Sequence, residues 1–422
     1  MIKYESFGLF KANYKLKHII SMKIIHLSFS DISGGASRAA YRVHQMLIKN
    51  GINSLMWVNQ KNSKDNTVYS SESKINKFIN IKKQHLRFPI NKILKSKLFG
   101  MHSPSILSSK WLTKINKSDA DIIHLHWVQG EMLSIREISE IKKPIIWTFH
   151  DMWPLCGCEH YAYNSRYIEG YKVDNKFQNE FKFFDINRWR WEKKVKLLKK
   201  PIQIISPSKW MTDCVKKSYL MKNWPVETIP HPIDTFKWRP IEKKVSRKEL
   251  NLPQNSKLII FGATGGTQDR RKGFELLETA LHYLKNLMKN DDINLIVFGG
   301  NNKNFYSKIP FKIHNFYEIN NDEILQKLYS AADVMVAPSK METFGLAAQE
   351  SISCGTPVVA FNNTGLAEII EHKVTGYLAE FLNEKELARG IEWTLKHLNE
   401  NILSINSRKR AEHHFSENVI IK

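Results

Sequence analysis

The chain alternates between short apolar runs and longer amphipathic stretches. The runs are rich in Ile, Val, Leu and Phe, and a length of about four to eight residues is typical of strands buried on both faces of a parallel sheet. The stretches between them repeat apolar residues at helical spacing. Strand followed by helix along most of the chain predicts an α/β fold. The expected strands are residues 23–29, 120–127, 144–151, 201–208, 257–263, 293–300, 313–319, 333–339, 356–361 and 375–378.

Glycines mark where several of the expected helices end. Gly51 follows the first helical pattern of the chain, and Gly355 follows the helix that begins at Leu346. A glycine just past the last helical residue is a common stop signal. The expected helices are residues 40–48, 274–288, 322–332, 346–354 and 384–398.

The length of 422 residues predicts two domains. A basic stretch punctuated by prolines, from Thr228 to Lys248, predicts the connection between them. We therefore expect a first domain at 22–235 and a second at 236–400. Residues 1–21 precede Met22, which opens directly onto the first strand, so they are expected to be a leader outside the fold.

The formal net charge is +23, which favours an acidic partner: nucleic acid, anionic lipid or a diphosphate. The Lys-rich segments 75–86 and 90–98 are amphipathic, and form either a basic surface able to lie against anionic lipid or a solvated helical hairpin. No apolar run reaches about 18 residues, and the first residues lack the apolar core of a signal peptide. We expect a cytoplasmic protein, or one peripheral on the inner face of the plasma membrane.

The four cysteines are too few and too scattered for a secreted disulfide framework, which favours a reducing compartment. Cys156, Cys158 and His160 are zinc-ligand types in close sequence. Their spacing is unusual and no second pair follows at a credible distance, so we expect no metal site there.

Two glutamates with seven residues between them, Glu342 and Glu350, flank the start of the helix that begins at Leu346. Backbone N–H groups at a helix N-terminus suit a phosphate, and carboxylates accept hydrogen bonds from sugar hydroxyls. A nucleotide-sugar needs both. The alternative is two solvated carboxylates, one on a loop and one on a helix. The residues expected at the donor are Thr343, Phe344, Gly345, Leu346 and Glu350.

Three consecutive cations, Arg270, Arg271 and Lys272, precede the expected helix that starts at Phe274. Like charges this close repel one another unless an anion lies between them. Their place before a helix N-terminus therefore predicts a phosphate site.

In the first half of the chain, Gly34, Gly35 and Ser37 follow the first strand and open a helix, which suits an anion or a close ligand but equally a bare tight turn. His150 ends its strand, where side chains of a doubly wound sheet reach ligands; the alternative is a core histidine satisfied by Asp151.

Two further features of this half leave alternatives open. We expect one of His124 and His126 to face the ligand and the other to be structural. A set of aromatic residues suits either sugar recognition or the packing of a long loop: Tyr161, Tyr163, Tyr167, Tyr171, Trp189 and Trp191.

The Glu342 to Glu350 pattern, with the strand before it and the Gly-Thr-Pro strand after it, resembles the Glu-x7-Glu signature of retaining nucleotide-sugar glycosyltransferases of family four. The resemblance covers roughly residues 22 to 400. It implies the GT-B architecture: two Rossmann-like doubly wound domains facing across a cleft, with a C-terminal helix at 401–422 crossing back to the first domain.

The resemblance also implies roles for individual residues. Lys272 matches the lysine that binds the donor diphosphate, whereas the position of the family arginine holds Ala263, so Arg271 or Arg270 is expected to supply that cation. The glycine-rich loop of the first domain is expected near the donor phosphates or the acceptor. The implied catalytic residues are Glu342, His150 and Lys272, with no metal and no cofactor.

The implied reaction transfers a hexose or related sugar from a nucleotide-sugar, with retention, to a glycan or polyprenyl-diphosphate-linked acceptor of a bacterial exopolysaccharide, capsule or lipopolysaccharide. A nucleotide-sugar epimerase of the same fold is one alternative. A basic nucleic-acid-binding protein is another, although the charge is diffuse and no nucleic-acid recognition module is present.

Overall fold

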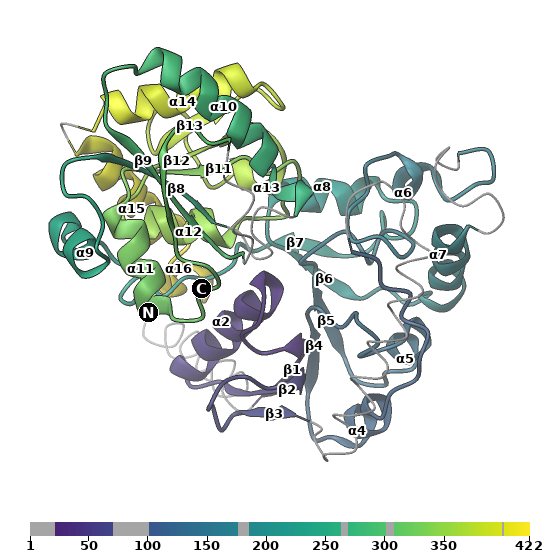
Figure 1. Cartoon of the computed structure of the whole chain (residues 1–422). Helices are drawn as coiled ribbons and strands as arrows, with labels where there is room; N and C mark the ends of the chain where they lie inside the picture. The colour runs from purple at the N-terminus through teal and green to yellow at the C-terminus, as the bar shows by residue number, and fades with distance from the viewer. Residues whose placement is uncertain (1–21, 71–100, 176–184, 263–268, 301–307, 399–400) are drawn as a thin grey trace, which may run out of the picture. The chain divides into compact units, whose positions relative to one another are not determined.

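The computed structural model describes residues 22–70, 101–175, 185–262, 269–300, 308–398 and 401–422 (Figure 1). These residues form two compact units. The first comprises the described residues up to Ser206 together with Thr212–Thr228, and the second comprises Pro207–Met211 and the described residues from Ile229 onward. The expected leader, the amphipathic segments 75–86 and 90–98, and Ala263 lie outside the described residues.

The first unit is built on a seven-stranded parallel sheet with the order β3-β2-β1-β4-β5-β6-β7. Its strands are β1 (Lys23–Ser30), β2 (Asn53–Gln60), β3 (Val68–Ser70), β4 (Ile122–Leu125), β5 (Ile145–Thr148), β6 (Gln203–Ser206) and β7 (Val226–Thr228). The helices of this part of the chain are α2 (Gly35–Lys49), α4 (Trp111–Lys117), α5 (Ile135–Ser139), α6 (Arg166–Glu169), α7 (Ile186–Leu197) and α8 (Lys209–Lys217).

Three of these strands were not expected from the sequence. In β2 the buried Ser54, Met56 and Val58 alternate with more exposed residues, so the strand lacks a continuous apolar run. Strands β3 and β7 have three residues each, which is too short for a periodic signal. Strand β3 lies in the polar segment that follows β2 and forms one edge of the sheet.

The second unit contains a six-stranded parallel sheet with the order β10-β9-β8-β11-β12-β13. Its strands are β8 (Lys257–Gly262), β9 (Ile293–Phe298), β10 (Lys312–Asn315), β11 (Val334–Ala337), β12 (Val358–Phe361) and β13 (Gly376–Ala379). Its helices are α9 (Lys243–Glu249), the 3-10 turn η2 (Arg270–Lys272), α10 (Phe274–Leu287), α11 (Asp322–Ala331), α12 (Leu346–Ser353), α13 (Thr364–Ala367), α14 (Glu384–Lys396), α15 (Ile402–His414) and α16 (Glu417–Ile420).

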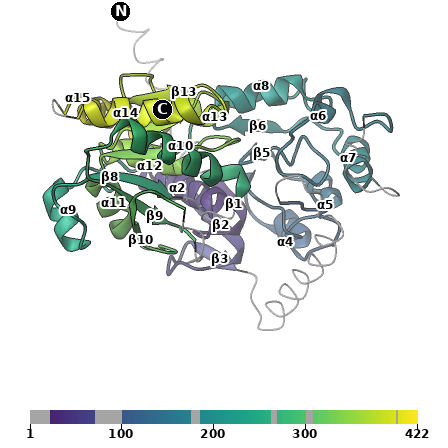
Figure 2. The same cartoon turned by 45° about the horizontal axis from the view of Figure 1, so that its top comes forward.

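Both faces of this second sheet are buried, which explains its continuous apolar strands. Along β8, Leu258 and Ile260 join the core that includes residues of α11, α12 and α15. Ile259 and Phe261 point the other way, into the core formed with α10 and α14. Helices α10 and α14 lie side by side in both views (Figures 1 and 2). The expected doubly wound α/β fold is therefore confirmed for this unit.

The end of the chain packs within the second unit. Helix α15 lies against α12, and the Ile233 N–H donates to the carbonyl of Phe415 at 2.8 Å. The expectation that residues 401–422 return to the first domain stays a prediction. Within the described part of the chain, no helix combines the length and apolar composition needed to span a membrane.

Candidate functional site

The strand order of the second unit brings two distant loops together. Strands β8 and β11 are parallel neighbours, with Ile259 opposite Val334, so the segments that follow them leave the same edge of the sheet. The segment after β8 leads through η2 into α10, and the loop after β11 leads into α12. As a result Lys272 meets Glu342, which is 70 residues further along the chain.

Lys272 and Arg271 both pair with Glu342. The Lys272 ammonium donates to one oxygen of this carboxylate, and an Arg271 nitrogen lies 3.2 Å from the other. Arg271 also pairs with Asp269 at 3.0 Å and donates to the Met341 carbonyl at 3.0 Å. Glu342 and Asp269 therefore supply internal anions to Lys272 and Arg271, and the phosphate site expected at these cations stays a prediction.

Charge and burial act against each other in this cluster. The side chains of Lys272 and Glu342 are only 19% and 13% exposed. Burial lowers the pKa of Lys272, and the Glu342 carboxylate opposes that shift only in part. Burial acts to raise the pKa of Glu342, but the Lys272 and Arg271 charges outweigh it and hold this pKa below its usual value.

The N-terminus of α12 follows Glu342 closely. Its N-cap is Gly345, with φ of 112°, and among the described contacts no side chain caps the helix. No acidic residue lies in its first turn, so its N–H groups are available to an anion. The phosphate contact expected from the backbone N–H groups near Phe344, Gly345 and Leu346 stays a prediction.

The side chains before this helix are less accessible than expected. Thr343 and Phe344 are 5% and 3% exposed, and the Phe344 ring packs edge-on against His231 and Phe415. This ring belongs to the core, so Phe344 can contact a donor only through its backbone.

Glu350 lies within α12 and is 5% exposed. One of its oxygens accepts a hydrogen bond from the Tyr329 hydroxyl at 3.1 Å. This bond orients the carboxylate within the helix. Its expected contact with the nucleotide ribose stays a prediction.

Tight backbone packing fixes the segment from Arg270 to Gly273, here called the cation loop. Gly273 has φ of 69°, and a Cβ added there would lie 2.0 Å from the Pro338 carbonyl oxygen. The Lys340 N–H donates to the Arg271 carbonyl at 2.8 Å. The two loops are therefore fastened to each other by backbone. Arg270, in contrast, is exposed.

In the first unit, the expected glycine loop follows β1 and opens α2. Gly34 is its N-cap, with φ of 86°, and a Cβ there would meet nothing within 4 Å. Asp31 fastens the loop, since its carboxylate accepts the N–H groups of Ile32, Asn62 and Ser63 at 2.8–3.1 Å. The loop combines a fixed base with open space at the glycine. The remaining members of this expected set are Gly35, the first residue of α2, and the buried Ser37.

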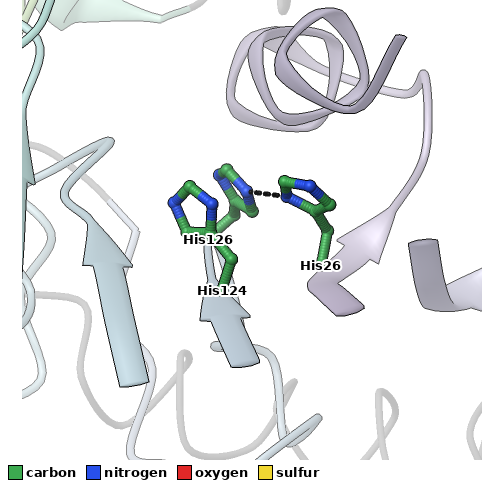
Figure 3. A group of neighbouring side chains, drawn as sticks. All are labelled: His26, His124 and His126. Atoms are coloured by element: carbon green, nitrogen blue, oxygen red, sulfur yellow. Dashed lines mark hydrogen bonds between the residues drawn. The ribbon is translucent and has the colours of Figure 1, made fainter. Parts of the chain in front are cut away.

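His150 belongs to a larger group of histidines that was not expected from the sequence. Figure 3 shows three other members of this group, His26, His124 and His126. His26 of β1 pairs in register with His124 of β4, and the His26 Nδ1 lies 2.9 Å from the His126 Nε2. The His126 Nδ1 in turn lies 3.0 Å from the His150 Nε2. His44 of α2 packs edge-on against His26.

The expectation that His124 and His126 divide between ligand and core was wrong. Both are buried and their rings stack with centroids 4.1 Å apart. Residues two apart on an extended chain face the same side, which explains the stacking. The same period marks His26, Ser28 and Ser30 as one buried polar face, and this alternation is the sequence signal that could have revealed the group.

Burial lowers the pKa of three of these imidazoles, His26, His44 and His124. It lowers the pKa of His26, which the neighbouring His124 and His44 lower further. It also lowers the pKa of His44 to about 4 and that of His124 to about 3. In the described residues, His26, His124 and His126 place ligand atoms within 4.8 Å of one another, close enough to consider a metal ion.

The Asp151 carboxylate accepts hydrogen bonds from several groups. Its carboxylate accepts from His160 at 2.6 Å, from the Trp127 indole at 2.9 Å and from the Trp153 N–H at 3.0 Å. Burial acts to raise its pKa, but His160 and these hydrogen bonds hold the pKa of Asp151 below its usual value. His160 also bonds to Ser103 at 2.8 Å, so its ring is used in structure rather than with Cys156 and Cys158.

The aromatic residues between Tyr161 and Trp191 differ in how far they are buried. Tyr171 and Trp191 are buried against each other, and the Arg166 guanidinium covers the Tyr171 ring at 4.3 Å. Packing explains these two. Tyr163 is 36% exposed and can still contact a ligand.

Two family models match most of the chain. Residues 33–237 match the model described as Glycosyltransferase Family 4, and residues 242–411 match the model described as Glycosyl transferases group 1. An uncharacterized glycosyltransferase of Methanocaldococcus jannaschii is 30% identical over 176 residues, or 40% of this chain and 44% of that protein. An uncharacterized 41.2 kDa protein in the cps region of Klebsiella pneumoniae is 27% identical over 207 residues, or 47% of this chain and 55% of that protein. The matched stretches thus span about half of these relatives.

Solved structures share the fold at low sequence identity. Sucrose-phosphate synthase from Thermosynechococcus elongatus has a TM-score of 0.63 at 18% identity, covering 94% of this chain and 96% of its own. Anabaena HepE in complex with UDP-glucose has a TM-score of 0.61 at 15% sequence identity, and the match covers 94% of this chain and 97% of HepE. WaaG, a glycosyltransferase involved in lipopolysaccharide biosynthesis, has a TM-score of 0.60 at 14% sequence identity, and the match covers 94% of this chain and 97% of WaaG. The expected pair of Rossmann-like α/β domains of the GT-B fold is confirmed. Because the two family models together span residues 33–411 with only a short gap, the chain belongs to the glycosyltransferases.

Proposed function

We propose that this chain transfers a hexose or related sugar from a nucleoside-diphosphate donor, with retention, to a glycan or lipid-linked acceptor of a bacterial surface polysaccharide. HepE binds UDP-glucose, and WaaG and the Klebsiella relative are connected by their names with lipopolysaccharide and the cps region. Retention and the acceptor rest on the resemblance of the Glu342 to Glu350 pattern to family-four enzymes.

The observation that carries the proposal is the cluster of Lys272, Arg271 and Glu342 beside the N-terminus of α12. Two cations held by one carboxylate can exchange that partner for a donor diphosphate, which has more charge and more acceptor oxygens. The α12 N–H groups then add neutral donors to the same phosphates.

This exchange has a consequence for catalysis. As the bond between sugar and phosphate breaks, negative charge grows on the leaving diphosphate, and preorganised cations stabilise it. Glu342, released from Lys272, is then a carboxylate beside a sugar that gains positive character. In this scheme side-chain cations and helix N–H groups balance the diphosphate, and no divalent metal or other cofactor is required.

The experiment separates the two glutamates of the pattern. Glu342→Gln should chiefly lower kcat, because this carboxylate acts on the transition state. Glu350→Gln should chiefly raise the donor KM, because ribose contacts are the same in ground and transition states. Steady-state kinetics with a panel of nucleotide-sugars measures both.

Glu275→Gln is a matched control, since Glu275 pairs with Lys340 beside the same loop. It should change neither constant by more than about twofold, in keeping with the small contribution of a partly exposed ion pair. Equal effects of all three substitutions, or the reverse assignment of kcat and KM, would contradict these roles of the two glutamates.

A lipid-linked acceptor would place the enzyme at the inner face of the plasma membrane. The net charge of +23 favours binding to anionic lipid, with an affinity that falls as salt screens the charges. Co-sedimentation with vesicles should show more protein bound to anionic than to neutral lipid at low salt. Equal binding to both would remove this part of the proposal.

A further inference from the structure

Three histidines, His26 in β1, His126 just after β4 and His150 just after β5, form a continuous chain of hydrogen bonds. The His26 Nδ1 is 2.9 Å from the His126 Nε2, and the His126 Nδ1 is 3.0 Å from the His150 Nε2. His26 and His126 are 0% and 1% exposed, whereas His150 is only partly buried. The chain of bonds therefore runs from the interior of the first unit to the predicted site residue.

Such a chain has only two possible directions. A neutral imidazole carries one N–H, which donates at one nitrogen while the other nitrogen accepts. Protons can point outward, with His26 donating to His126 and His126 to His150. Alternatively they can point inward, with His150 donating to His126 and His126 to His26.

The buried end of the chain distinguishes these directions. The His26 Nε2 is fully buried and has no hydrogen-bond partner among the described residues. If the protons pointed inward, this nitrogen would carry an N–H with nothing to receive it. An orphaned buried N–H is rarer and more costly than an unfilled lone pair on a nitrogen, so the outward direction is favoured.

We propose that His26 and His126 are positioning residues that direct the protons outward and hold His150 as the tautomer protonated at Nδ1. The His150 Nε2 is then occupied as an acceptor of the His126 N–H. Resting on the proposed function, the inference deepens it: His150 meets a substrate as a hydrogen-bond donor through Nδ1. A sugar hydroxyl or phosphate oxygen is the matching acceptor, and His150 does not serve as the base that takes a proton.

A metal ion held by His26, His124 and His126 is the competing explanation. A metal lies close to the plane of each imidazole that binds it. The rings of His124 and His126 stack at 4.1 Å with 30° between their planes, so their in-plane lone pairs run side by side rather than converging. The gap between His26 and His126 is also the length of a shared proton, at 2.9 Å.

Nitrogen-15 NMR of the full chain labelled on histidine tests the tautomer directly, since protonated and bare ring nitrogens differ widely in chemical shift. The His150→Asn variant assigns the signals. We expect the wild type to show His150 protonated at Nδ1 and bare at Nε2. Protonation at Nε2 in the wild type would overturn the proposal.

Substitutions at His126 supply the control. His126→Asn keeps an N–H donor near the place of Nδ1 and should preserve the His150 tautomer. His126→Leu removes the donor, and His150 should shift toward the Nε2-protonated form that free imidazole prefers. An unchanged tautomer in His126→Leu would show that another group fixes it and would overturn the proposal.

Two further measurements separate this inference from its rivals. With an active donor, His126→Leu should lower kcat roughly tenfold, and the donor KM should change little. This is the lower end of the range for removing a partner that orients a functional histidine. His126→Asn should keep most of the wild-type kcat. The tautomer measurement stands even if no sugar transfer is found, so the two proposals fail separately. Stoichiometric binding of Co²⁺ or Zn²⁺ that is lost in His26→Asn would overturn the proposal, because the metal would occupy the lone pairs that the shared protons need.

Discussion

Two clusters of polar side chains, the linked histidines of the first unit and the ion pairs around Glu342 in the second, are built on opposite principles. In the first unit His26, His126 and His150 join through hydrogen bonds between ring nitrogens, from the buried His26 and His126 to the partly buried His150. In the second unit Lys272 and Glu342 join through charge, in loops at the edge of the sheet. Location explains the difference, because a buried sheet face accommodates polar groups only when they are uncharged and paired, whereas a partly exposed edge tolerates ions.

The comparison also indicates what each cluster can do. Neutral imidazoles linked nitrogen to nitrogen can fix the direction of a hydrogen bond, but they offer little charge to a diphosphate. The ion cluster offers charge and can change partners when a more highly charged anion arrives. The proposed binding of the donor phosphates therefore falls to the second unit, and the proposed orientation of a neutral contact to the first.

The largest expected effect is that of removing the charge of Lys272. Lys272→Ala should cost about 2 to 4 kcal/mol of transition-state stabilisation, the range for one preorganised electrostatic contact, so kcat should fall by roughly 30-fold to 1000-fold. Lys257→Ala is the matched control. Lys257 pairs with Asp291 at the start of β8, whereas Lys272 follows the other end of this strand. If both variants retained wild-type turnover, the ion cluster would have no catalytic role.

The next effect tests the neutral cluster by pH. The pKa of His44 is about 4 in the folded chain and about 6.5 when unfolded. The unfolded state therefore takes up this proton first, and stability that is complete above about pH 6.5 is lost as the pH falls toward 4. The loss from His44 should be roughly 3 kcal/mol, at about 1.4 kcal/mol per pKa unit.

Urea unfolding of wild type and His44→Gln across this pH range measures the loss. The variant should be less stable at neutral pH, where it lacks the bonds of His44 to Ser54 and Thr67, but should vary less with pH. Glu342 gives the contrast: its folded pKa is lowered, so its contribution persists until the pH falls below the usual range of a glutamate. Parallel pH curves for variant and wild type would contradict a neutral, buried His44.

The smallest expected difference lies between the loop glycines of the two units. Gly34 and Gly273 both have positive φ, but only at Gly273 would a Cβ meet backbone, the Pro338 carbonyl oxygen at 2.0 Å. Gly34→Ala should cost about 1 to 3 kcal/mol for its conformation alone, because φ of 86° and ψ of 161° lie in a region adopted essentially only by glycine. Gly273→Ala should cost about 1 to 2 kcal/mol for its left-handed conformation and about 2 kcal/mol more because the loop must also move. Denaturant midpoints of the two variants test this, and equal costs would show that the cation loop shifts freely.

The sequence predicted elements better than contacts. The run from Leu258 to Phe261 has no polar residue, which correctly indicated a strand buried on both faces. The loops carrying Lys272 and Glu342 were also correctly expected at the ends of strands. That the two side chains pair with each other depends on β8 lying next to β11, and strand order is set by tertiary packing rather than by either local pattern.

The histidine cluster shows a different limit. His124, His126 and His150 were weighed one at a time, although alternation along β4 places the first two on one face. His26 and His44 come from elements far away in sequence, and only the pairing of β1 with β4 and the packing of α2 bring them in. Local spacing predicts the face of a residue, but not which residues of other elements share that face.

Binding of a nucleoside diphosphate is the sharpest test of the donor site proposed at Lys272. The melting temperature of wild type, Lys272→Ala and Lys257→Ala would be measured with a panel of nucleoside diphosphates and their sugars. A ligand at about 100 times its Kd should stabilise the wild type by about 2.7 kcal/mol. We expect at least one member of the panel to stabilise wild type and Lys257→Ala alike, and Lys272→Ala much less. Equal stabilisation of all three proteins, or of none, would contradict the donor site.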